Sequence, residues 1–149
     1  MKDLFNPTVH NEFVERINKV TPESKAQWGK MNSAQMMAHV SEAFKSALGQ
    51  EKLKRSFIGF WFGKMAKKSF IGGKPFKQNL PTAPQFKITN EREFEKEKKL
   101  TLDLINQFCT GGPEKISSHP HTFFGKMSPD EWNKLMSNHL DHHLKQFGV

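Results

Sequence analysis

Four segments of the chain carry apolar residues at the spacing of an amphipathic α-helix. In the first segment, Asn6 followed by Pro7 is a typical helix start, because Asn caps free N–H groups and Pro fits the first turn. We expect this helix to end at about Val20. The second helix is predicted to be capped by Ser33 and to cover residues 34–48.

The two remaining predicted helices lie in the C-terminal part of the chain. One begins near Asn90 and ends at Gly111-Gly112-Pro113, which is a strong helix-terminating sequence. The other has the clearest start in the chain, since Ser128 can cap it and Glu131, three residues later, completes a capping box. We expect this last helix to extend to about Phe147.

Residues 50–89 interrupt the helical pattern with glycines and prolines, which favours a long crossover with one short helix. No strand-like alternation and no internal repeat occur, and 149 residues are enough for one hydrophobic core. We therefore predict an all-α fold with a single domain over residues 1–149. Its architecture is a four-helix bundle with the long crossover between helices 2 and 3.

The composition adds an expected location. No stretch approaches the roughly 20 apolar residues that span a bilayer, and the N-terminus lacks the apolar part of a secretory signal. We therefore expect no transmembrane segment and a cytoplasmic protein. The lone Cys109 fits a reducing compartment and is interpreted as a small apolar residue near a helix end.

The net charge of +8 is concentrated between residues 51 and 87, a segment that contains nine basic residues and one acidic residue. The basic residues are Lys52, Lys54, Arg55, Lys64, Lys67, Lys68, Lys74, Lys77 and Lys87. Aromatic residues interleave with them, namely Phe57, Phe60, Trp61, Phe62, Phe70 and Phe76. We interpret this stretch first as a crossover that closes one end of a site. Dimerisation, contact with an anionic membrane and nonspecific nucleic-acid binding are alternatives, and no motif indicates specific nucleic-acid recognition.

Candidate chemistry lies on the last predicted helix, which carries His139, His142 and His143. On a helical wheel, His139 and His143 share the apolar face and His142 lies at its rim. Their spacing brings the Cβ atoms to about 5–6 Å, so that both imidazoles can converge on one metal ion. The alternative is a pair of core histidines bonded to neighbouring groups, because an unpaired buried polar group costs roughly 1–3 kcal/mol.

The second predicted helix carries a third candidate, His39, at the margin of its apolar face. Three neutral imidazoles with one open position are typical of catalytic zinc, and a bundle core is a known place for such sites. The alternatives are an ordinarily hydrogen-bonded His39 and Glu42, one turn later, as a rival ligand. Gln35 and Asp141 are candidates to orient the imidazoles.

Two stretches of sequence resemble the DinB/YfiT-like superfamily of metal-dependent enzymes. WGKMNSAQMMAHV, residues 28–40, is similar to the superfamily's Trp, capped helix and first histidine. HPHTFFGKMSPDEW and HLDHHLKQFG, both within residues 119–148, resemble the DUF1569 branch, whose function is unknown. The resemblance covers the two histidine-bearing helices and the segments that lead into them.

This resemblance implies that His39, His139 and His143 bind a divalent metal ion, zinc or nickel, with His142 beside them but not bound. It also implies a homodimer and a small-molecule substrate, such as a low-molecular-weight thiol, since characterised relatives transfer thiols or isomerise their adducts. Such an ion would act as a Lewis acid or lower the pKa of bound water or thiol. The resemblance assigns no role to His119 or His121.

We therefore expect a metal-dependent hydrolase or thiol transferase that acts on a small molecule. One alternative is a noncatalytic metal-binding helical bundle. The other is a basic interaction module for anionic membrane or nucleic acid, in which the histidines are incidental.

Overall fold

The computed structural model describes residues 2–51 and 56–149, except for the side chains of Phe57 and Phe60. Three residues of the basic stretch, Lys52, Lys54 and Arg55, therefore lie outside the described residues. Within the described part of the chain there are five α-helices and no strand, which confirms the all-α prediction. The helices are α1 (Pro7–Lys19), α2 (Ser33–Ala47), α3 (Phe57–Ile71), α4 (Phe94–Gly111) and α5 (Pro129–Gln146), with 3-10 turns η1 (Pro84–Phe86) and η2 (Gly112–Lys115).

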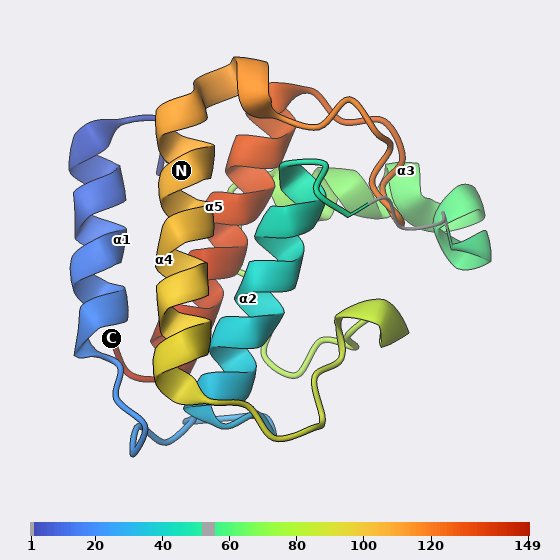
Figure 1. Cartoon of the computed structure of the whole chain (residues 1–149). Coiled ribbons are helices and arrows are strands. Elements are labelled where there is room, and N and C mark those ends of the chain that lie inside the picture. Colours follow the sequence, from blue (N-terminus) through green and yellow to red (C-terminus); the bar gives the residue numbers. More distant parts are fainter. Residues whose placement is uncertain (1, 52–55) are drawn as a thin grey trace.

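Four of the helices, α1, α2, α4 and α5, lie side by side in Figure 1, and α3 crosses behind them. α2 packs against both α4 and α5, α1 packs against the same two helices, and α3 contacts α5. Buried residues from α1, α2, α4 and α5 form one hydrophobic cluster, which includes Phe13, Val40, Phe108 and Leu140. The histidine-bearing helices α2 and α5 therefore pack against each other and contribute to the same core.

The predicted helix starts are correct at Asn6 and Ser128 and wrong for the other two helices. The side chain of Ser128 accepts from Glu131 N, which completes the predicted capping box. Asn32, not Ser33, caps α2. Ser33 instead donates its hydroxyl to the Pro22 carbonyl at 3.1 Å, so a tertiary contact occupies the group that was expected to cap.

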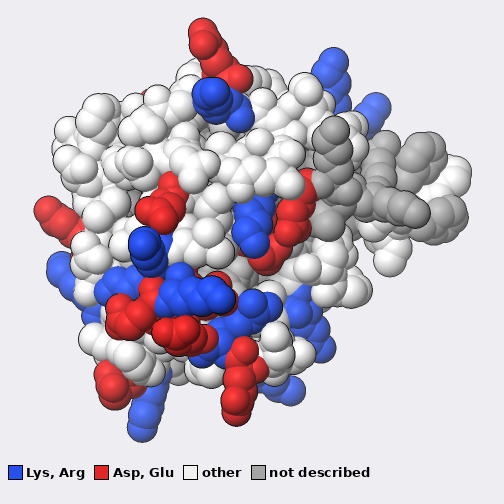
Figure 2. Space-filling model, in the orientation of Figure 1, with Lys and Arg blue, Asp and Glu red and all other residues white. Residues whose placement is uncertain are grey.

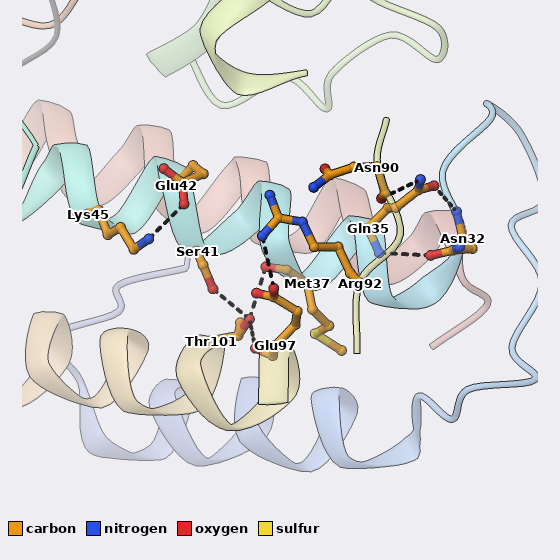
Figure 3. Close-up of polar contacts among 10 residues, drawn as sticks. All are labelled: Asn32, Gln35, Met37, Ser41, Glu42, Lys45, Asn90, Arg92, Glu97 and Thr101. Carbon is orange, nitrogen blue, oxygen red and sulfur yellow. Dashed lines mark hydrogen bonds and ion pairs between the residues drawn. The ribbon is translucent and has the colours of Figure 1, made fainter. Parts of the chain in front are cut away.

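The helix expected from Asn90 begins four residues later, at Phe94. Asn90 lies outside the helix, and its backbone carbonyl accepts a hydrogen bond from the Gln35 side chain at 3.2 Å. This contact, drawn in Figure 3, joins the segment before α4 to the start of α2. The C-terminal end is as predicted, since α4 ends at Gly111 and Gly112 takes a positive φ of 60°.

The crossover contains a longer helix than expected, because α3 has 15 residues. Ser56 caps it by accepting a hydrogen bond from Gly59 N at 2.9 Å. Gly59 and Gly63 weaken helix propensity, which is why the sequence favoured only a short helix here. Both glycines are buried against residues 123 and 124, so tertiary packing overrides the local preference.

A buried polar contact sets the position of α2 against α4 (Figure 3). Thr101 Oγ1 on α4 lies 2.9 Å from Ser41 Oγ and 3.0 Å from the Met37 carbonyl, both on α2. Thr101 and Ser41 are each 1% exposed, so these hydrogen bonds are shielded from water. Because Ser41 is two residues from His39, this contact also helps to place the first candidate ligand.

Charged side chains of both signs are intermixed over the beginning of α4, in the lower part of Figure 2. This agrees with the sequence count, in which the excess of positive charge belongs to residues 51–87. None of the helices in the described residues is long and apolar enough to cross a membrane.

Candidate metal centre

The structure brings the three predicted histidines together between α2 and α5. His139 Nε2 lies 2.9 Å from His39 Nε2 and 3.2 Å from His143 Nε2. The ring centroids of the three imidazoles are 4.6–4.9 Å apart. His39 and His143 are buried, at 6% and 7% exposure, and His139 is partly buried.

The remaining ring nitrogens of His39 and His143 are both occupied. His39 Nδ1 donates to the Phe86 carbonyl at 2.8 Å, and His143 Nδ1 donates to the Gln146 side-chain oxygen at 2.9 Å. Gln146 is itself held, because its amide nitrogen donates to the Trp28 carbonyl at 2.7 Å. A neutral imidazole that donates through Nδ1 carries a lone pair on Nε2, so both rings aim a lone pair at His139.

His139 cannot satisfy both of these lone pairs with its own hydrogens. A neutral His139 with its hydrogen on Nε2 can donate to only one of the two neighbouring Nε2 atoms. In addition, His139 Nδ1 is buried and has no hydrogen-bond partner among the described residues, which is energetically unfavourable. Three electron-rich nitrogens therefore meet at one point with at most one hydrogen between them.

Protonation does not relieve this arrangement near neutral pH. Burial lowers the pKa of His139 well below its usual value, and the neighbouring histidines lower it further. Burial also lowers the pKa of His39, and it lowers the pKa of His143 to about 3. All three imidazoles are then neutral, which is the form that binds metal ions.

The geometry fits a divalent cation. A tetrahedral ion about 2.0–2.1 Å from each of two imidazole nitrogens holds them roughly 3.3 Å apart. The distances of 2.9 and 3.2 Å from His139 Nε2 to its two neighbours are close to this value. The ligand atoms of His39, His139 and His143 all lie within 4.8 Å of one another, and the group could hold a metal ion. Imidazole nitrogen is a donor suited to zinc, nickel, copper and iron, and less to magnesium or calcium.

Two residues of the crossover, Phe76 and Phe86, lie against this cluster. The Phe76 ring lies 6.4 Å from the His139 ring and 5.8 Å from the His142 ring, and η1 supplies the carbonyl that holds His39. Beside the cluster is a cavity of about 170 Å³, lined by Trp28, Pro75, Phe76, Gln78, Asn138, Asp141, His142 and Lys145. His142 thus faces this cavity and is not one of the three histidines that could hold a metal ion.

The residues that orient the imidazoles differ from those expected from the sequence. The Gln35 side chain forms the capping box of α2 and bonds to the Asn90 carbonyl, and it makes no hydrogen bond to the His39 ring. Asp141 pairs with Arg16 at 2.8 Å and with Lys145 at 2.7 Å. The orienting groups are the Phe86 carbonyl and Gln146. Neither was predicted from the sequence, although Gln146 lies three residues after His143 on the same helix.

Glu42, the rival ligand, pairs with Lys45 at 2.7 Å and is not part of the three-histidine group. Its charge still reaches the site, since Glu42 raises the pKa of His39 against the larger lowering by burial. This is an electrostatic influence and not coordination.

The two histidines of the stretch His119-Pro120-His121 lie in different surroundings. His119 is exposed, whereas the ring of His121 stacks on Phe124 at 4.7 Å. His121 Nδ1 accepts hydrogen bonds from the backbone N–H groups of Phe123 and Phe124, at 3.0 and 3.1 Å. His121 therefore shapes the turn before α5 and is not part of the candidate metal centre.

Fold and site together define an all-helical protein with a buried cluster of three histidines that could hold a metal ion. The chain belongs to the DUF1569 family, described as a protein of unknown function, whose model matches residues 5–148. Searches of curated proteins and of solved structures gave no significant match.

Proposed function

We propose that this chain is a metal-dependent enzyme whose divalent ion, zinc or nickel, is held by His39, His139 and His143. The observation that carries the proposal is the convergence of three Nε2 atoms, two of which belong to rings whose Nδ1 lies within hydrogen-bond distance of an oxygen acceptor. We also propose that α1, α2, α4 and α5 form a four-helix bundle of the DinB type, with α3 in its crossover, and that the protein is cytoplasmic.

When bound, the ion would supply Lewis-acid chemistry to a small molecule. The residues of the chain would hold and enclose the site. The Phe86 carbonyl and Gln146 keep the imidazole rings in the ligating orientation. Phe76 and the crossover restrict access of water from their side of the cluster.

The adjacent cavity supports a small substrate. Its volume of about 170 Å³ suits a compact molecule or one part of a larger one. Its lining combines the aromatic rings of Trp28 and Phe76 with the charged side chains of Asp141 and Lys145. Such a lining can hold a polar molecule with an apolar portion, as a low-molecular-weight thiol or its adduct has.

A panel of small thiol adducts and hydrolysable esters tests the enzyme proposal. The wild type, reconstituted with zinc or nickel, is compared with His143→Ala, and His119→Ala is the control because His119 is exposed. The proposal predicts turnover of at least one compound that rises with bound metal in wild type and control and is absent in His143→Ala. Turnover independent of metal content would contradict it.

One observation favours a second candidate function, a noncatalytic metal-binding bundle. The cavity is lined by His142, whereas His39, His139 and His143 do not line it. An ion enclosed in this way would stabilise the packing of α2 on α5 without meeting a substrate. Metal binding with no turnover across the panel would support this function over the enzymatic one.

A further inference from the structure

One face of α3 is seated so closely on the protein that the rotation of the helix is fixed. A Cβ added at Gly59 would lie 2.6 Å from Phe123 Cα, and one added at Gly63 would lie 1.9 Å from the Phe123 carbonyl oxygen. Both positions are therefore restricted to glycine, and the glycine face of α3 must point inward. The opposite face is consequently presented to the outside.

That outward face is strongly apolar. Its side chains are Ile58, Trp61, Phe62 and Met65, with exposures of 64%, 67%, 56% and 74%. Their spacing of three and four residues places them on one side of the helix. The remaining exposed large apolar residue in the described part of the chain, Leu80, is only 38% exposed, so the apolar surface is concentrated on α3.

Positive charge borders this apolar face. At 100° per residue, Lys64 and Lys68 lie along one margin of the apolar face, and both are exposed. Lys67 lies closer to the body of the protein, where it pairs with Glu131 at 2.7 Å. The sequence contains no acidic residue from residue 52 to residue 90, so the surroundings of α3 carry positive charge without compensation within this segment.

We propose that α3 binds the surface of an anionic lipid bilayer. The helix would lie in the plane of the interface, with Ile58, Phe62 and Met65 among the acyl chains and with Lys64 and Lys68 at the lipid phosphates. In Figure 1 the N-terminal part of α3 projects beyond the other helices, so the body of the protein does not obstruct this contact.

Two other occupants fit the surface less well. A second copy docked through the same face by two-fold symmetry would bring lysine margins together without an acidic partner on α3. A nucleic acid would be attracted by the lysines and could stack single-stranded bases on Trp61 or Phe62, but Ile58 and Met65, which are as exposed, offer it neither hydrogen bonds nor a stacking ring. An anionic bilayer offers acyl chains to the apolar face and lipid phosphates to the lysines at its margin.

Co-sedimentation of the chain with lipid vesicles tests the proposal. The chain is expected to sediment with vesicles that contain phosphatidylserine and phosphatidylcholine and to remain in solution with phosphatidylcholine alone. Lys64→Glu with Lys68→Glu should weaken binding by roughly thirtyfold or more. Phe62→Ser with Met65→Ser should weaken it by roughly tenfold or more, and both variants alter exposed side chains that the core does not need.

The matched control is Lys96→Glu with Lys99→Glu, which makes the same change in net charge at exposed positions on α4. This control should bind vesicles nearly as well as the wild type. Equal losses in the control and in the α3 charge variant, or no sedimentation of the wild type with phosphatidylserine, would overturn the proposal. So would a dimer in solution that Phe62→Ser with Met65→Ser dissociates, or binding to duplex DNA, in the absence of vesicle binding.

Discussion

His39 on α2 and His139 on α5 are separated by 100 residues in the sequence, and their Nε2 atoms lie 2.9 Å apart. The Phe86 carbonyl takes the Nδ1 hydrogen of His39, so that His39 presents a lone pair to His139. His143 presents a second lone pair from the other side, 3.2 Å away. A cation shared by the three rings is the simplest group that stabilises this arrangement at neutral pH.

Gln146 positions His143 and should therefore control metal affinity. Gln146→Leu removes the acceptor of the His143 Nδ1 hydrogen, so the ring is no longer fixed in its ligating orientation. We expect zinc affinity to fall by about 10–100-fold. Gln35→Ala is the control, since the Gln35 side chain caps α2 and makes no hydrogen bond to the His39 ring. Titration calorimetry with zinc gives both affinities, and a larger loss in Gln35→Ala would show that the orienting residue is misassigned.

Thr101 should contribute to stability without contributing to metal binding. Thr101→Val removes the buried hydroxyl that bonds to Ser41 and lies 2.8–3.0 Å from the Glu97 and Met37 carbonyls, while nearly conserving volume. The expected loss in the free energy of unfolding is about 1–3 kcal/mol, measured by urea denaturation of the metal-free protein. Thr110→Val, at an exposed hydroxyl on the same helix, should change it much less. Similar losses in the two variants would argue against the buried network.

His121 should make the stability of the protein depend on pH in a defined window. Burial lowers its pKa from 6.5 to about 4, so the folded state favours the neutral ring. The resulting stabilisation is fully present above pH 6.5 and is lost as the pH falls towards 4, because the unfolded chain then binds a proton that the folded chain does not. The shift corresponds to at most about 3 kcal/mol.

Comparison of His121→Asn with the wild type isolates this contribution. Asn keeps an oxygen that can accept from Phe123 and Phe124 but does not titrate. The free energy of unfolding of His121→Asn should therefore decrease less between pH 6.5 and pH 4 than that of the wild type. His119→Asn, at an exposed position, should keep the wild-type profile. Parallel profiles for wild type and His121→Asn would contradict the prediction.

Cys109 should be chemically inert in the folded protein. Burial, with a smaller effect of the Asp3 carboxylate, raises the pKa of its thiol to about 12, so almost no thiolate exists at neutral pH. We expect no modification by iodoacetamide under native conditions and complete modification after unfolding, as measured by mass spectrometry. Fast modification of the native protein would show that the thiol is accessible. The structure confirms the interpretation of Cys109 as a buried residue near a helix end.

The features predicted correctly from sequence depend mainly on neighbouring residues. The Ser128–Glu131 capping box is complete within four residues, so its sequence is enough to identify the start of α5. The shared face of His139 and His143 follows from helical spacing alone. The inclusion of His39 was inferred from its place on an apolar margin and from family resemblance, and the structure brings it to the other two.

The features that sequence reasoning missed depend on long-range contacts. Gln146 orients His143 only because the Trp28 carbonyl, 118 residues away, holds its amide. α3 is longer than predicted because Gly63 packs against Phe123, a contact that local propensity does not report. The segment before α4 is likewise held by a long-range contact, the hydrogen bond from Gln35 to Asn90 across 55 residues.

Metal content per chain tests the central claim most directly. The protein, purified without a histidine tag, is incubated with zinc or nickel and desalted, and its metal content is measured by inductively coupled plasma mass spectrometry. His139→Ala and the control His119→Ala, at an exposed position, are treated in the same way. Circular dichroism confirms that each variant is helical. We predict about one ion per chain in the wild type and in His119→Ala and almost none in His139→Ala. A wild type that retains no more metal than a folded His139→Ala would contradict the account.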